Sequence, residues 1–127
     1  MPRPPPHPTL SIRVRFGGDD MMGPGKAALL DRIAVTGSIA AAARDMGMSY
    51  KRAWMLIETL NAMFDAPLVE SSRGGTARGG AVLTERGRAV LEEYRAVEQA
   101  ASAHAAPHLR RLHGWLRRSA EKSQTMD

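Results

Sequence analysis

The sequence has no cysteine among its 127 residues. This absence excludes disulfides, zinc–thiolate sites and a thiol nucleophile, so the fold must be stabilised by packing. No run approaches the roughly 18 apolar residues that a membrane span requires, and the first residues lack the apolar core of a signal peptide. We therefore expect a soluble, cytoplasmic protein without a membrane partner.

Recognisable catalytic motifs are also lacking. The sequence contains no paired carboxylates with local support, no nucleophile elbow, no phosphate-binding P-loop and no metalloprotease helix motif. His104 and His108 are four residues apart, but neither a carboxylate nor a cysteine completes a metal site, and Pro107 lies between them. We expect solvent-exposed histidines, no metal, no cofactor and no enzymatic activity.

Length and charge point to one small domain with an anionic partner. A chain of 127 residues supports a single core. Its 18 Lys and Arg against 13 Asp and Glu give a formal charge of +5, which suits a polyanion without requiring one. Five prolines in the first eight residues favour an extended, solvated arm. We predict an arm at 1–8, the domain at 9–106 and a basic tail at 107–127.

The hydrophobic periodicity predicts a mainly helical fold with a small β-hairpin. Strict alternation from Leu10 to Phe16 indicates a half-buried strand. Helical spacing and capping residues predict helices over about 26–36, 39–46, 49–63 and from Thr84 to an interruption at Pro107, with a further basic helical stretch at 109–116. Two short strands, 68–72 and 81–83, flank the glycine-rich basic segment 73–80, which is typical of a wing.

The second and third predicted helices form a candidate helix-turn-helix. Ser38 and Ser49 are suitable N-caps, and Gly47 can take a left-handed backbone at the turn between them. Ala43 permits close approach of the two helices. The inward face of the predicted helix 49–63 consists of Ala53, Leu56, Ile57 and Leu60. Helix pairs of this kind also occur in ordinary helical domains, and the basic wing that follows favours DNA binding.

The remaining side chains around this motif are the candidate DNA contacts. They are Ser38, Ser49, Tyr50, Lys51, Arg52, Trp54 and Met55 on the helix-turn-helix, and Arg73 and Arg78 on the wing. Hydroxyls and free helix amides bind phosphate, cationic side chains bind phosphates or guanine edges, and Tyr or Met touches a thymine methyl. Two alternatives stay open, because Trp54 could be a core aromatic and the wing arginines could only solubilise the loop.

Residues 37–54, from Gly37-Ser-Ile-Ala through Met-Gly-Met-Ser to Ala-Trp54, resemble the signature of the ModE-type molybdate-dependent regulators. Pro67-Leu-Val-Glu70, the glycine pairs at 74–75 and 79–80, Ala81-Val-Leu-Thr84 and Gly87 also resemble that family and, more loosely, the LysR-type regulators. The resemblance covers about residues 10–101. It implies a winged helix-turn-helix that pairs through its first helix and its long last helix, and that binds a palindromic operator.

The long last helix independently favours a partner chain. Its apolar stripe is longer than a small domain needs for its own core, although the helix could also fold back on its own domain. The stripe consists of Val90, Leu91, Tyr94, Val97 and Ala101. Only 20 residues follow Pro107, too few and too polar for the molybdate-binding domain of the family.

The leading hypothesis is therefore a homodimeric, sequence-specific transcriptional regulator that binds double-stranded DNA and lacks the oxyanion sensor. A second hypothesis is an adaptor that uses the same fold to bind another protein. A third is a regulator that binds molybdate or tungstate at a non-standard site. The sequence does not identify a small-molecule effector.

Overall fold

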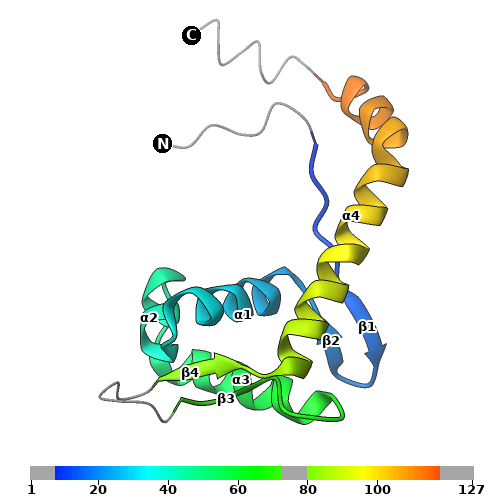
Figure 1. Cartoon of the computed structure of the whole chain (residues 1–127). Helices are drawn as coiled ribbons and strands as arrows, with labels where there is room; N and C mark the ends of the chain where they lie inside the picture. The colour runs from blue at the N-terminus through cyan, green and yellow to red at the C-terminus, as the bar shows by residue number, and fades with distance from the viewer. Residues whose placement is uncertain (1–7, 73–79, 118–127) are drawn as a thin grey trace, which may run out of the picture. The chain divides into compact units, whose positions relative to one another are not determined.

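The computed structural model describes residues 8–72 and 80–117, which divide into two compact units. One unit spans Ser11–Val97 and contains most of the secondary structure, and the other joins Met1–Leu10 with Glu98–Asp127. In chain order the elements are β1 (Val14–Gly17), β2 (Asp20–Met22), α1 (Pro24–Thr36), α2 (Ile39–Asp45), α3 (Tyr50–Met63), β3 (Val69–Ser71), β4 (Ala81–Leu83) and α4 (Glu85–Gly114) (Figure 1). The predicted mainly helical winged helix-turn-helix fold with a long last helix is confirmed.

The core of the Ser11–Val97 unit lies where the first three helices meet the stem of the wing. Its largest fully buried side chains are Met22, Leu29, Leu30, Ile33, Leu60 and Leu68. Burial of one such side chain contributes about 1.5–3 kcal/mol, so this cluster is the main source of stability. The unit has no buried charged or polar residue among those described.

The predicted wing stem is confirmed. β3 and β4 pair in antiparallel register, with Val69 opposite Leu83 and Ser71 opposite Ala81. Residues 73–79, which include Arg73 and Arg78, lie outside the described residues. The structure therefore fixes where the wing starts and ends.

The N-terminal strand departs from the prediction. It covers Val14–Gly17 instead of the expected 10–16, and it pairs with β2, a strand that the sequence did not predict. Gly17 and Gly18 have φ values of 119° and 56°, so the glycines that seemed to end the strand turn it into a hairpin. Phe16, the last residue of the expected half-buried strand, is 56% exposed.

The predicted interruption at Pro107 is wrong. α4 continues through Pro107 to Gly114, so the expected tail from residue 107 and the expected stretch at 109–116 both begin inside this helix. A proline inside a helix removes one hydrogen bond to the carbonyl four residues earlier, that of Ala103. Ala103 and Pro107 are both exposed, so water can reach that carbonyl, and the preceding alanine-rich segment favours helix.

Asn61 joins the end of α3 to β3. Its Oδ1 accepts the amides of Leu68 at 2.8 Å and Val69 at 3.1 Å, and its Nδ2 donates to the Val69 carbonyl at 3.0 Å. The side chain thus replaces a strand partner along this stretch of backbone. Asn61 sets the position of the wing stem relative to α3.

Thr84 starts α4, as predicted. Its Oγ1 accepts the amide of Gly87 at 2.9 Å and donates to the Pro67 carbonyl at 2.6 Å. Gly87 packs directly on the backbone of Leu68. The first turn of α4 is therefore held against the residues that precede β3.

Within residues 8–72 and 80–117, no helix combines the length and the apolar character that a bilayer crossing would require.

Candidate nucleic-acid interface

α2 and α3 form the helix-turn-helix, and both predicted N-caps are confirmed. Ser38 Oγ accepts the Ala41 amide at 3.1 Å, and Ser49 Oγ accepts the Arg52 amide at 3.0 Å. Side-chain caps of this kind each stabilise a helix by about 1 kcal/mol. The local sequence therefore fixes where each helix of the motif begins.

The turn between the helices is tight because of one glycine. Gly47 has φ of 67°, as predicted, and the Met48 amide then donates to the Ala43 carbonyl at 3.0 Å. Ala43 on α2 and Ala53 on α3 are both buried. This geometry holds α3 at a fixed angle to α2.

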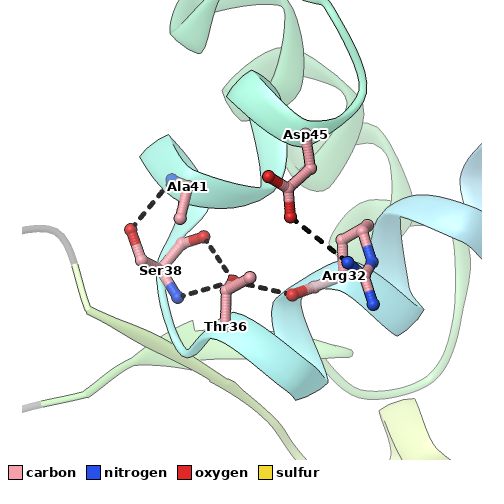
Figure 2. Close-up of polar contacts among 5 residues, drawn as sticks. All are labelled: Arg32, Thr36, Ser38, Ala41 and Asp45. Atoms are coloured by element: carbon pink, nitrogen blue, oxygen red, sulfur yellow. Dashed lines mark hydrogen bonds and ion pairs between the residues drawn. The ribbon is translucent and has the colours of Figure 1, made fainter.

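A polar cluster joins the end of α1 to α2 (Figure 2). The Thr36 hydroxyl lies 2.6 Å from the Arg32 carbonyl and accepts the Ser38 amide at 3.3 Å. Arg32 also forms an ion pair of 3.2 Å with Asp45, at the other end of α2. Both side chains of this pair are about two-fifths exposed, so the pair adds little stability and acts mainly by orienting α2.

The wing stem attaches to the same corner. The Ala81 amide donates to the Gly37 carbonyl at 3.0 Å, and Ser38 pairs with Gly80 as an isolated antiparallel bridge. Ser38, a predicted DNA contact, therefore lies at the junction of helix-turn-helix and wing, where its hydroxyl already caps α2. Capping α2 and bridging to Gly80 are therefore sufficient to explain why a serine lies at this position.

The outer face of α3 carries the other predicted contacts of the motif. Ala53, Ile57 and Leu60 are buried beneath it. The predicted contacts are all exposed, namely Ser49, Tyr50, Lys51, Arg52, Trp54 and Met55. Trp54 is 45% exposed, so the alternative that it is a core aromatic is wrong.

A shallow hollow of about 290 Å³ lies along this face. Its lining includes Ser49, Lys51, Arg52 and Met55, and also Thr59, which the sequence did not single out. Two cations, hydroxyl groups and a thioether in one hollow provide contacts for phosphate oxygens, base edges and a methyl group. Thr59 lies one helical turn after Met55, and this spacing could have identified it as a candidate contact from the sequence.

Among residues 8–72 and 80–117, no three His, Asp or Glu side chains gather into a cluster that could hold a metal ion. His108 instead lies beside Arg111, at 3.5 Å between Nδ1 and the guanidinium.

A scan of protein families matches residues 26–88 to the bacterial regulatory helix-turn-helix protein, LysR family. The match runs from the first turn of α1 to the first turn of α4 and includes the helix-turn-helix and the wing stem.

Curated relatives include the molybdenum-pterin-binding protein MopB of Rhodobacter capsulatus. It is 48% identical over 77 residues, which cover 61% of this chain and 28% of MopB. The DNA-binding transcriptional dual regulator ModE of Escherichia coli (strain K12) is 42% identical over 86 residues, which cover 68% of this chain and 31% of ModE. The aligned part therefore amounts to about a third of the length of these relatives.

Among solved structures, the crystal structure of the CbnR_DBD–DNA complex is similar with a TM-score of 0.52 and 25% identity. The alignment covers 66% of this chain and 91% of the matched chain. CbnR, described as a LysR family transcriptional regulator, matches with a TM-score of 0.51. The family match and the structural similarity thus both indicate a helix-turn-helix domain of the LysR type.

Proposed function

Because residues 26–88 form a LysR-family helix-turn-helix domain of the ModE type, we propose that this chain binds double-stranded DNA and regulates transcription. The observation that carries the proposal is the outer face of α3, where Lys51 and Arg52 are exposed while Ala53, Ile57 and Leu60 are buried on the opposite face. A recognition helix presents its N-terminal residues to the major groove, and both cations lie in the first turn of α3. Tyr50, Trp54 and Met55 extend the same contact surface.

We further propose that two copies bind a palindromic operator. Val97 on α4 is 44% exposed and Val35 on α1 is 69% exposed, so both helices implied in pairing offer apolar surface. A twofold dimer presents its two α3 helices about 34 Å apart, which corresponds to half-sites about ten base pairs apart. Sedimentation equilibrium of the chain, alone and with DNA, measures the stoichiometry.

Selection of bound sites from random duplex DNA tests the function directly. We expect an inverted repeat with that spacing to be enriched, and we expect the same repeat with and without molybdate. Retention on DNA without enrichment of any sequence would contradict the proposal and favour an adaptor. A repeat that is enriched only with molybdate would show control by an oxyanion.

The wing gives a separate prediction. We propose that Arg73 and Arg78 contact the phosphate backbone, because a basic glycine-rich wing can follow the DNA backbone closely. Arg73→Ala with Arg78→Ala should then reduce the slope of log Kobs against log[salt] by about 1.8, since each phosphate contact contributes about 0.9.

The matched control is Arg73→Lys with Arg78→Lys, which keeps both charges and should keep the slope. Filter binding at several salt concentrations measures all three proteins. An unchanged slope in the alanine variant would mean that the wing arginines do not touch phosphate.

A further inference from the structure

An apolar groove of about 310 Å³ lies in the Ser11–Val97 unit, away from the contact face of α3. The β1–β2 hairpin, Phe64 and one side of α4 form its walls. Three aromatic side chains line it, those of Phe16, Phe64 and Tyr94, and the two phenylalanine rings meet edge to face with centroids 6.1 Å apart. Phe16 is 56% exposed and Val97 is 44% exposed, so a large part of this apolar surface faces solvent.

The polar groups of the groove select what can bind there. Arg86 is neutralised by Asp65, with contacts of 2.9 and 3.3 Å. The Tyr94 hydroxyl already donates to the Ile12 carbonyl at 2.6 Å. Glu93 is exposed, so the groove offers aromatic walls with a carboxylate on the rim.

The chain contains a segment with the complementary chemistry. Residues 1–7 read Met-Pro-Arg-Pro-Pro-Pro-His, with four prolines and one charged side chain, Arg3. Proline-rich segments favour the polyproline II conformation, lose little entropy on binding and dock in aromatic-lined grooves. The positive charge of Arg3 matches the negative charge of Glu93.

We propose that the groove binds the proline-rich residues 1–7 of a second copy of this chain. The proposed pairing surface favours a second copy as the source. Val97 lines the groove and also belongs to the exposed apolar surface of α4 that is proposed to pair, so the groove is continuous with the surface that would meet a second copy. Exchange of identical arms is a low-cost way to join two protomers.

Seven residues in polyproline II span about 22 Å, because each residue rises about 3.1 Å. The inference rests on the proposed homodimer, but it does not require DNA binding, so the two proposals can fail separately.

The chain provides its own probes, because its only two phenylalanines, Phe16 and Phe64, both line the groove. A variant without residues 1–7 is labelled with 4-fluorophenylalanine and mixed with unlabelled full chain. We expect both fluorine resonances to shift progressively as the full chain is added. A donor with Pro4→Ala, Pro5→Ala and Pro6→Ala should produce little or no shift at the same concentration.

The charge contact has a matched control. Glu93→Gln in the labelled chain should reduce the shift, whereas Glu92→Gln should not, because Glu92 is exposed on α4 but does not line the groove. A peptide of residues 1–9, added at millimolar concentration, should reproduce the shift caused by the full chain.

Three outcomes would overturn the proposal. The alanine donor could shift both resonances as much as the unchanged donor, in which case another part of the second copy covers the groove. The labelled full chain could differ from the armless chain at a concentration at which sedimentation shows only monomers, which would indicate docking within one molecule. Resonances that no donor moves would show that the arm does not bind there, and DNA binding by the same samples would test the proposed function independently.

Discussion

Gly87→Ala is expected to destabilise the protein by about 3 kcal/mol, because a methyl group inserted against packed backbone cannot be accommodated by side-chain movement. A Cβ at this position would lie 2.1 Å from the Leu68 carbonyl oxygen and 3.0 Å from its carbon. The Leu68 carbonyl also accepts the Thr84 amide at 2.9 Å, so moving it away breaks the link between α4 and β3. Thermal unfolding followed by circular dichroism should show a midpoint lower by more than about 10 °C.

Gly25→Ala is the matched control. Gly25 also lies in a helix, α1, but a Cβ there meets nothing within 4 Å. Alanine is favoured over glycine in helices by up to about 1 kcal/mol, so this variant should be as stable as the original chain or slightly more stable. Equal midpoints for the two variants would contradict the close packing of α4 on Leu68.

Replacing Lys51 and Arg52 together by alanine should weaken operator binding about 100-fold or more. Contacts of cationic side chains with base edges are each worth about 1–3 kcal/mol, and about 1.4 kcal/mol corresponds to a factor of ten. Both side chains are exposed at the start of α3 and outside the core, so the fold and the oligomeric state should not change. Electrophoretic shifts at a selected operator measure the affinity.

Arg13→Ala with Arg15→Ala removes the same charge elsewhere in the unit. Both arginines are exposed, and they lie at and before β1, away from the helix-turn-helix. This control should lose only the weak, sequence-independent part of the binding. If the Lys51 and Arg52 variant loses no more affinity for the operator than the Arg13 and Arg15 variant does, α3 is not the recognition helix.

Local chemistry accounts for the features that were predicted correctly. The caps at Ser38 and Ser49 and the turn at Gly47 each depend on hydrogen bonds between residues at most five positions apart. The inward face of α3 follows from the helical period. Sequence alone therefore predicted the helix-turn-helix and the stem of the wing with nearly correct ends.

The errors have different physical causes. The sequence treats Pro107 as a break, but a helix can pass a proline where solvent reaches the freed carbonyl and alanine precedes it. It treats Gly17 and Gly18 as the end of a strand, whereas their positive φ values turn the chain back to pair with β2. In both cases the sequence showed which residues change the course of the backbone. Whether the helix or strand then ends or continues depended on the structure around those residues.

The sequence by itself determined the winged helix-turn-helix class, the start of each helix in the motif and the cationic first turn of α3. Tertiary structure alone decided how these parts are joined. The joining contacts are the bonds from the Asn61 side chain on α3 to Leu68 and Val69, the Arg32–Asp45 pair and the bond from the Ala81 amide to the Gly37 carbonyl. Tertiary structure also brought Phe16, Phe64 and Tyr94 into one groove. These contacts join residues many positions apart, and no local periodicity encodes them, because they form only when the helices have packed.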